Sequence, residues 1–530
     1  MGGRVSELLE TFSRGPVRVG EALCDSHPAE SVAFVLVDGE LEHSEISYGE
    51  LAASSRRFAQ VLADRGIGPG DRIAILLPKC AELLTVLVGA WRRGVTVVPL
   101  FTAFAEPEVR YRCNSARVKM ILTNEKHASK VDLALLHDGV EVLVCGVENA
   151  STFGSFDAAM SSSSLRPVAD FDASPGHPLI CLYTSGTTGR PKGVLVPVRA
   201  LASMQAYLEF GLDVRTDDVY WNAADPGWAY GLFYGITAPL CAGLTSLLLT
   251  EGFSPELTFA VMSKFGVTNF AAAPTVYRAL QASGAAPNRP GTLRVASSAG
   301  EPLGSNALRW SQEVLGLVIR DHYGQTELGM CVANAHNAML GQEARPDSMG
   351  RELPGWSVAI LDPETGDSNL EVTDGELAIA VDASPLMWFT GYDQDPEHTA
   401  AKFSGDRKWY LTGDLASRGQ DGYFSFKARA DDLIIMAGYR LGPEEIEDVL
   451  IRHPAVREAA VVAIQDDLRG EVVTAYVVPA AGVEVGPDLE AELKTWVKES
   501  FAAHAYPRIV RFVSDLPRTA SGKLQRKALR

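Results

Sequence analysis

The feature of this sequence that most constrains its fold is the alternation of strand-like apolar runs with stretches of helical periodicity. Arg72–Leu77 and Val118–Thr123 are short apolar runs, and Glu82–Arg92 between them carries apolar residues at helical spacing. The alternation continues in three later segments: Leu293–Ser297, Ser305–Leu315 and Leu317–Arg320. Strands that alternate with helices predict parallel sheets covered by helices. We therefore expect an α/β fold.

The pattern changes twice towards the C-terminus. After about residue 355 the apolar runs shorten, as in Val358–Leu361 and Gly375–Ala380, which predicts a smaller β-rich subdomain. Past Asp431, about 100 residues combine helical and strand-like segments, which is typical of a compact α+β domain. The elements predicted there are a helix at Pro443–Leu450, strands at Ala459–Ile464 and Val472–Val478, a helix at Asp488–Phe501 and a strand at Ile509–Val513.

Charge and composition exclude several classes of protein. The chain has 48 Lys and Arg residues against 66 Asp and Glu, for a net charge of −18, and it has no dense basic run. Nucleic acid and anionic membrane surfaces are therefore not expected as partners. The length of 530 residues, with 46% hydrophobic and 22% charged residues, is typical of a multidomain globular protein and excludes a disulfide scaffold or a disordered chain.

Cysteine usage and the N-terminus predict a cytoplasmic protein. The seven cysteines stand singly and form no C-x-x-C pair, which fits a reducing compartment and not a zinc site. The first ten residues lack the apolar run of a signal peptide. Pro226–Thr250 is uncharged and long enough to cross a bilayer, but its glycines and prolines and the flanking Asp225 and Glu251 predict a buried segment instead.

The strongest local signal is the segment Leu182–Leu195, which directly follows an apolar run. Hydroxyl side chains and glycines are concentrated there, so that backbone N–H groups and hydroxyls can surround an anion, and Lys192 adds positive charge. Pro191 departs from the Walker A pattern. We interpret the segment as a phosphate-binding loop of a different kind.

Seven motifs in order resemble those of the adenylate-forming superfamily, which includes acyl-CoA synthetases, non-ribosomal peptide adenylation domains and luciferases. The first is the phosphate loop. The others are Ala299–Leu303, Asp321–Glu327, Tyr410–Asp414, Lys427–Asp432, Ala437–Arg440 and Pro517–Lys523. Together with the N-terminal alternation, the resemblance covers nearly the whole chain.

The resemblance implies a two-domain ligase. Residues 1–430 would form an AMP-binding domain of stacked α/β sheets with the β-rich subdomain, and 432–530 a small mobile domain that turns about a hinge at Asp431. A carboxylic acid, ATP and Mg²⁺ would give an acyl adenylate and diphosphate, and CoA would then displace AMP. We expect no nucleic acid, no membrane span, and a monomer or homodimer.

Roles for individual residues follow from the motifs. The residues expected to bind ATP or AMP are Thr184, Ser185, Gly186, Thr187, Thr188, Gly189, Lys192, Gly300, Glu301, Pro302, Asp321, His322, Tyr323, Gly324, Gln325, Thr326, Asp414 and Arg429. The Asp414 carboxylate suits a ribose diol, and Glu327 offers Mg²⁺ a hard oxygen ligand. Thr184, Glu327 and Lys523 are the expected catalytic residues, and the lysine would neutralise charge between carboxylate and α-phosphate. Gly438, Tyr439 and Arg440 would face CoA.

The acid is the least determined part of the prediction. We expect Trp228, Ala229, Tyr230 and Gly324 to line the acyl pocket, because acetate-specific relatives carry Trp where this chain has Gly324. The glycine would leave an open space and favour short- to medium-chain or branched aliphatic acids, with aryl acids as a lesser possibility. Pro197 stands where the family often has a histidine.

Two alternatives stay open from the sequence. The chain could load a separate carrier protein instead of CoA, or it could be an adenylate-binding regulator without turnover. The end of the sequence seven residues after Lys523 leads us to expect no fused carrier domain.

Overall fold

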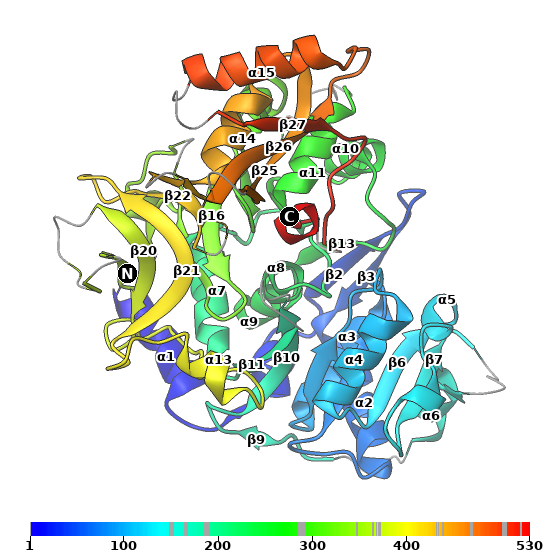
Figure 1. Cartoon of the computed structure of the whole chain (residues 1–530). Coiled ribbons are helices and arrows are strands. Elements are labelled where there is room, and N and C mark those ends of the chain that lie inside the picture. Colours follow the sequence, from blue (N-terminus) through cyan, green and yellow to red (C-terminus); the bar gives the residue numbers. More distant parts are fainter. Residues whose placement is uncertain are drawn as a thin grey trace.

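The computed structural model describes residues 2–147, 153–163, 168–184, 191–284, 292–345, 348–362, 365–366, 368, 373–430, 432, 434–436, 439–466, 470–500, 506–519 and 522–530. These residues form a large body of α/β sheets, a β-rich subdomain and a small C-terminal unit (Figure 1). The predicted α/β class is confirmed.

The first large sheet has seven strands in the described part of the chain. In spatial order they are β11 (Lys192–Pro197), β10 (Pro178–Thr184), β5 (Thr96–Pro99), β4 (Arg72–Leu76), β6 (Met120–Asn124), β7 (Glu141–Cys145) and β8 (Gly154–Ser155). Strands β5, β4, β6, β7 and β8 pair in parallel, whereas β10 and β11 pair antiparallel. The helices along this part of the chain are α2 (Tyr48–Asp64), α3 (Ala81–Arg92), α4 (Glu106–Ala116), α5 (Glu125–Ala128) and α6 (Phe156–Ser162).

The second large sheet has nine strands among the described residues. In spatial order they are β18 (Arg351–Glu352), β17 (Gly329–Ala333), β16 (Arg320–Gln325), β15 (Val295–Ala299), β14 (Asn269–Ala272), β12 (Tyr220–Asn222), β13 (Ser246–Leu249), β2 (Val32–Val37) and β3 (His43–Ser47). The helices of this region are α7 (Ala200–Phe210), α10 (Pro255–Lys264), α11 (Pro274–Ala282) and α12 (Ser305–Trp310). Its central strands pair in parallel and are almost entirely buried, as the apolar runs predicted.

One predicted strand is displaced. The run Leu317–Arg320 was expected to be extended, but β16 begins only at Arg320, opposite Ser297 of β15. Gly316, with a φ of 76°, ends the preceding helical turn in the left-handed conformation. The residues between Gly316 and Arg320 therefore connect this turn to β16. The motif Asp321–Glu327 occupies β16 and the turn that follows it.

The β-rich subdomain is an antiparallel sheet, yellow in Figure 1. Its strands are β19 (Val358–Leu361), β20 (Asp374–Ala380), β21 (Trp409–Arg418) and β22 (Phe424–Arg429). The register places Asp414 of β21 opposite Arg429 of β22. Two of the predicted motifs therefore lie side by side on neighbouring strands.

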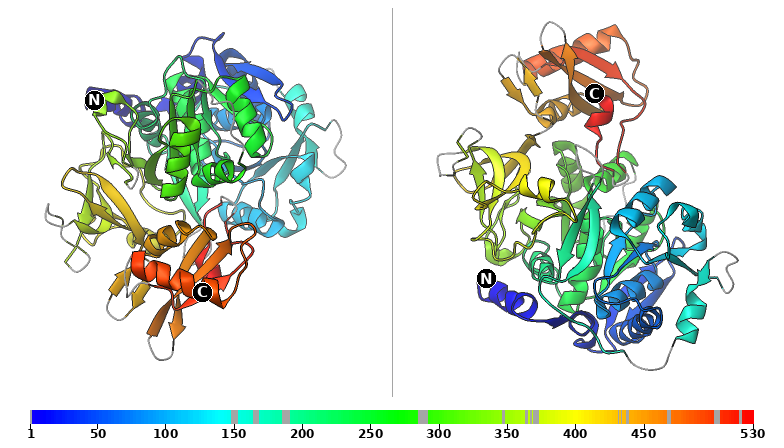
Figure 2. Two further views of the ribbon diagram at one scale, coloured as in Figure 1. Left: turned by 90° about the horizontal axis from the view of Figure 1, so that it is seen from above. Right: turned by 60° about the horizontal axis from the view of Figure 1, so that its bottom comes forward.

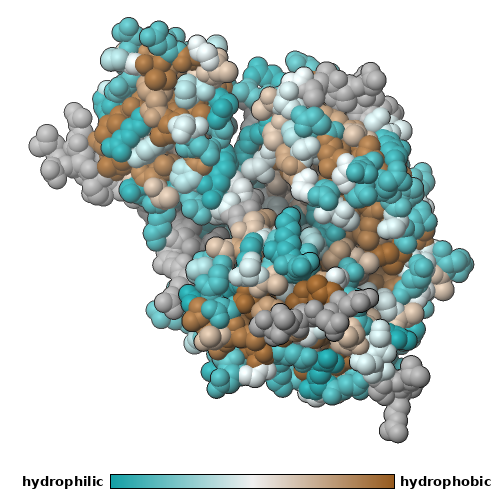
Figure 3. All heavy atoms as spheres, turned by 90° about the vertical axis from the view of Figure 1, so that its right-hand side faces the viewer, coloured by the Kyte–Doolittle hydropathy of each residue, from teal (hydrophilic) through white to brown (hydrophobic). Residues whose placement is uncertain are grey.

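The small C-terminal unit stands apart from the body in Figure 2 and has its own apolar core. It comprises a hairpin of β23 (Ile434–Met436) and β24 (Tyr439–Leu441), helices α14 (Pro443–Ile451) and α15 (Pro487–Ser500), and a sheet of β25 (Val456–Asp466), β26 (Gly470–Pro479) and β27 (Ile509–Phe512). Each element predicted from the sequence is present within a few residues of its expected place. Figure 3 shows the surface hollowed between a smaller lobe and the larger body.

The uncharged segment Pro226–Thr250 lies in the core of the body. It forms α8 (Ala229–Gly231), α9 (Ala238–Ala242) and β13, and Phe233, Ile236 and Leu240 are each at most 1% exposed. None of the helices in the described ranges has the length and apolar character that crossing a bilayer requires.

Candidate active site

The two ends of the predicted phosphate loop are held together by the first sheet. Thr184, the last residue of β10, pairs with Lys192, the first residue of β11. Lys192 Nζ lies 5.3 Å from the centre of the Tyr392 ring. Ser185, Gly186, Thr187, Thr188 and Gly189 lie outside the described residues. The hairpin geometry therefore fixes where the loop begins and ends.

Asp414 is almost completely buried and its carboxylate is held by two residues of the Asp321–Glu327 motif. The Oδ2 atom accepts hydrogen bonds from Tyr323 Oη at 2.5 Å and from Gln325 Nε2 at 2.7 Å. Arg429 Nε lies 3.9 Å from Oδ1. Motifs about 90 residues apart in sequence thus form one cluster.

Glu327 lies in the turn after β16 and is 8% exposed. Its Oε1 accepts a hydrogen bond of 2.7 Å from the hydroxyl of Tyr392. Among the residues that the structure describes, no group of three or more His, Cys, Asp or Glu side chains could hold a metal ion. A single carboxylate suits Mg²⁺, which in nucleotide sites binds through one or two carboxylates together with phosphate oxygens.

Lys523 enters this site from the C-terminal domain. Its Nζ lies 5.5 Å from the centre of the Trp228 ring, and its Cε lies 3.8 Å from the position that a Cβ on Gly300 would occupy. Burial and the nearby Arg429 lower the pKa of the ammonium group, while the carboxylates of Asp414 and Glu327 oppose that effect. The lysine is therefore a half-buried cation within electrostatic range of two carboxylates.

The loop after β15 lies next to Lys523. A Cβ on Gly300 would lie 2.9 Å from the Trp228 ring, and Gly300 has a φ of 114°, so only glycine suits this close approach. Glu301, followed by Pro302, forms an ion pair with Arg278. The structure thus brings Gly300 of the segment Ala299–Leu303 close to Trp228 and to Lys523.

Asp321 and His322 are neighbours in β16, the first half-buried and the second buried, and their surroundings shift the two pKa values in opposite directions. Burial raises the pKa of Asp321 to about 8, although the backbone N–H of His322 and the Arg278 cation favour its charged form. Burial lowers the pKa of His322 to about 3. Both nitrogens of the His322 ring have partners, Tyr207 Oη at 2.7 Å and the Asn334 carbonyl at 3.3 Å, so any contact of His322 with a nucleotide would have to come from its backbone.

The predicted acyl wall forms part of an aromatic cluster. The Tyr230 ring lies 5.8 Å from that of Trp228 and 5.5 Å from that of Tyr234, and Tyr230 Oη lies 3.2 Å from Tyr207 Oη. Tyr230 is 1% exposed and Ala229 is 8% exposed. The wall is therefore bulky, and a hydrogen bond fixes its orientation.

The expectation that Gly324 leaves an open space is wrong. A Cβ on Gly324 would overlap the carbonyl oxygen of Gly329 and lie 2.8 Å from Met330 Cα, because β16 and β17 approach closely at an irregularity after Tyr323. A larger residue at position 324 would displace the backbone of β17. The glycine allows the hairpin to close, and it does not open the pocket.

Four predicted positions of the hinge and the CoA-facing loop have no described side chain. Asp431 and Gly438 lie outside the described residues, and Tyr439 and Arg440 are described only as backbone of β24. Thr326 lies in the turn between β16 and β17. Sequence reasoning missed Tyr392, which is 65 residues from its partner Glu327 and has no local signal.

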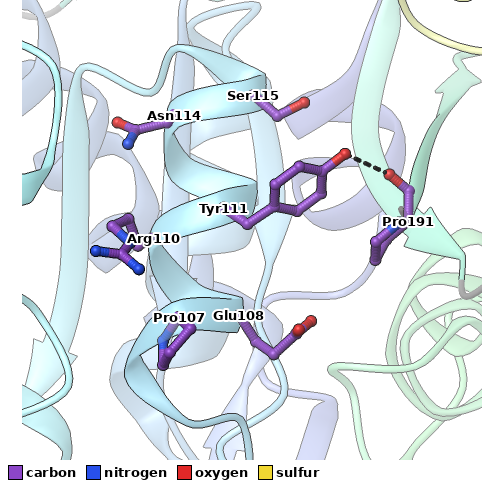
Figure 4. Close-up of a pocket in the computed structure, with 7 residues that line it drawn as sticks. All are labelled: Pro107, Glu108, Arg110, Tyr111, Asn114, Ser115 and Pro191. Atoms are coloured by element: carbon purple, nitrogen blue, oxygen red, sulfur yellow. Dashed lines mark hydrogen bonds between the residues drawn. The ribbon is translucent and has the colours of Figure 1, made fainter. Parts of the chain in front are cut away.

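A surface cavity of about 500 Å³ lies between α4 and Pro191, which directly precedes β11 (Figure 4). Tyr111 points across it and donates a hydrogen bond of 3.0 Å to the Pro191 carbonyl. The cavity contains none of the predicted catalytic residues. It is separate from the site around Lys523.

Comparison with known proteins decides the family. The model of AMP-binding enzymes matches residues 21–392, and that of the AMP-binding enzyme C-terminal domain matches residues 445–523. The chain belongs to the AMP-binding enzymes. This AMP-binding enzyme is 33% identical to acetyl-coenzyme A synthetase of Bacillus subtilis over 96% of its own length and 88% of the relative's. It is 34% identical to the mitochondrial acyl-coenzyme A synthetase ACSM4 of Homo sapiens, over 93% and 85% of the two chains.

Solved structures agree with this assignment. Acyl-CoA synthetase of Brucella canis is 40% identical, with a TM-score of 0.77 over 99% of this chain and 96% of that one. ATP-bound MatB from Rhodopseudomonas palustris is 29% identical, with a TM-score of 0.85 over 97% and 98%. The AMP-binding enzyme described here is thus an AMP-forming acid–CoA ligase that uses ATP, Mg²⁺ and CoA and forms an acyl adenylate.

Proposed function

We propose that this ligase activates short- to medium-chain or branched aliphatic acids at the point where Lys523 meets Trp228 and Gly300. The contact between domains supports the position of the reaction. It joins the catalytic-lysine segment to the acyl wall, and Asp414 and Glu327 lie near enough to affect the charge of the same lysine. The bulky aromatic wall of Trp228 and Tyr230 supports an acid of limited chain length.

In the first half-reaction an oxygen of the carboxylate attacks the α-phosphorus of ATP, and the bond to the β-phosphate breaks. Lys523 would neutralise both the carboxylate and the α-phosphate with its ammonium group. Thr184, Lys192 and the loop between them would bind the phosphates, Asp414 the ribose and Tyr323 the adenine. Glu327 would hold Mg²⁺, which supplies charge neutralisation at the phosphates.

In the second half-reaction the sulfur of CoA attacks the acyl carbon, the thiol proton is lost and AMP leaves. No side-chain nucleophile is needed in either step. We propose that the C-terminal domain turns between them, which would withdraw Lys523 and bring Gly438, Tyr439 and Arg440 to the site.

The contacts on either side of Asp431 support it as the hinge between domains 1–430 and 432–530. The Ala430 N–H donates to the Gly413 carbonyl of β21 at 2.9 Å, so residue 430 belongs with the body. The Asp432 carboxylate pairs with Arg526 at 3.3 Å and with Arg530 at 2.9 Å, so residue 432 belongs with the small domain. Asp431→Pro fixes φ and should slow thioester formation while adenylation persists. Equal rates in both half-reactions would exclude the hinge.

The nature of the acid is tested by a screen. CoA-dependent AMP release should be measured with acids from acetate to dodecanoate and with benzoate. An apolar wall gains about 0.8 kcal/mol per buried CH₂, so we expect kcat/KM to rise from acetate to an optimum at about three to eight carbons. Preference for acetate over butyrate and hexanoate would refute the proposed acid class.

A matched pair of variants tests the wall itself. Tyr230→Ala removes a buried ring and should move the optimum to longer acids, whereas Tyr230→Phe keeps the ring and should not. An optimum that stays in place in Tyr230→Ala would remove Tyr230 from the pocket.

Loading of a carrier protein and regulation without turnover were the two alternatives that the sequence left open. The relatives and solved structures that match this chain are acyl-CoA synthetases and CoA ligases instead.

The proposal includes a cytoplasmic location, because all seven cysteines are free, which fits a reducing compartment. It also includes a monomer or homodimer, which light scattering would distinguish.

A further inference from the structure

A buried hydrogen-bond network controls how the Asp414 carboxylate is presented. Its Oδ2 atom accepts from both Tyr323 Oη and Gln325 Nε2. A carboxylate oxygen has two lone-pair directions, so Oδ2 is saturated by the protein. Oδ1 then keeps its acceptor capacity for the two hydroxyls of a ribose.

The orientation of the Gln325 amide is fixed at both ends. Its Nε2 also donates to the Thr412 carbonyl at 2.9 Å, and its Oε1 accepts from the Tyr410 hydroxyl at 3.0 Å. Turning the amide over would place Oε1 against a carboxylate and a carbonyl, both of which are acceptors. Tyr410 is 0% exposed, so no water competes for its hydroxyl.

Tyr410 is therefore linked to Asp414 by hydrogen bonds through Gln325. Two strands are involved: β21, which carries both Tyr410 and Asp414, and the end of β16, which carries Gln325. Because hydrogen bonds to a charged group are stronger than neutral ones, the arrangement restrains the carboxylate before any ligand arrives. Such preorganisation reduces the ordering that binding would otherwise require.

We propose that Tyr410 and Gln325 are positioning residues that hold Asp414 in the orientation that accepts the ribose hydroxyls. The proposal rests on the ribose role of Asp414 given above. It assigns Gln325 to Asp414 and not to direct contact with ATP, and it assigns a function to the Tyr410 hydroxyl.

The test compares ATP with 2′-deoxy-ATP in acid-dependent diphosphate release without CoA. The ratio of kcat/KM for the two nucleotides measures recognition of the ribose hydroxyl. Gln325→Leu should raise the KM for ATP about tenfold, with kcat changed less than twofold, and should reduce the ratio by a similar factor. Gln325→Glu places a second carboxylate beside Asp414 and should have a larger effect, and Tyr410→Phe a smaller one in the same direction.

Controls separate positioning from a general loss of structure. Tyr277→Phe removes another buried hydroxyl, which donates to the Ser297 carbonyl at 2.9 Å, and it should leave the nucleotide ratio unchanged. Asp414→Ala should remove the preference for ATP over 2′-deoxy-ATP. If Gln325→Leu does not fold, the nucleotide ratio of Tyr410→Phe, which loses only one oxygen atom, tests the positioning role instead.

The outcomes separate the positioning role of Gln325 and Tyr410 from the ribose role of Asp414. A wild-type ratio in Gln325→Leu or Tyr410→Phe, together with loss of the ratio in Asp414→Ala, overturns the positioning role alone. An unchanged ratio in Asp414→Ala overturns the proposed ribose role, and with it this inference.

Discussion

Lys523→Ala should reduce acyl-adenylate formation by about 10²- to 10³-fold and leave the attack of CoA on supplied acyl adenylate nearly unchanged. The magnitude follows from the position of the lysine, which is half-buried against Trp228 and the Gly300 loop. A cation at such a place acts in a medium of low dielectric constant, where its interactions are stronger than in water. Its removal therefore costs more than that of a surface charge.

The two half-reactions should be measured separately. Diphosphate release without CoA reports adenylation, and acyl-CoA formation from supplied acyl adenylate reports the second step. Lys527→Ala, an exposed lysine four residues away, is the matched control and should change neither rate appreciably. Equal losses in both half-reactions of Lys523→Ala would refute the reasoning.

The pH dependence provides a second check on the same lysine. Burial lowers the pKa of Lys523 from its ordinary value of 10.5, so the ammonium form is lost at a lower pH than in a solvated lysine. Adenylation by the free enzyme should therefore decline on the alkaline side before pH 10.5. A decline in the adenylation rate that begins only at or above pH 10.5 would show that the pKa of Lys523 is not lowered.

Three further predictions concern contacts around the site. Tyr392→Phe removes the donor to Glu327 and should raise the Mg²⁺ concentration for half-maximal diphosphate release about tenfold; an unchanged Mg²⁺ titration would exclude this role. Asn306 Nδ2 donates to the Ile451 carbonyl across the domains at 3.2 Å, so Asn306→Asp should slow adenylation about fivefold but not thioester formation. Equal slowing of both half-reactions would show that this hydrogen bond does not favour the adenylation arrangement of the domains. Burial raises the pKa of Asp321 from 3.8 to about 8 in the folded protein, so its ionisation lowers the free energy of unfolding as pH rises through that range. Between pH 6 and pH 9 the Asp321→Asn variant should therefore lose less stability than wild type in urea unfolding. Parallel losses in the two proteins would show that the pKa of Asp321 is not raised.

Local sequence predicted the elements well where backbone pattern alone decides them. Pro443 and the acidic residues after it place the start of α14 correctly, and the apolar run at Arg72–Leu77 becomes β4. Side-chain direction was predicted less well. His322 and Gln325 belong to a motif expected to face the nucleotide, but both side chains bind other protein groups, because the neighbours of β16 supply Tyr207, Tyr410 and Asp414.

Gly324 is a second position at which the sequence did not predict the surroundings of a residue. A glycine aligned with a bulky residue in relatives suggests empty space. In this chain the space is filled by the backbone of β17, because the hairpin closes there. How closely two strands approach depends on their pairing, and no single position in the sequence records it.

The sequence by itself determined the α/β class, the separate C-terminal domain and the family, because strand and helix periodicity and short motifs are local properties of the chain. Only the tertiary structure decided that Lys523 lies on Trp228, that Tyr392 holds Glu327, and that Gln325 serves Asp414. These pairs join segments far apart in sequence. Their geometry is set by the packing of the sheets and of the two domains, which local propensity does not encode.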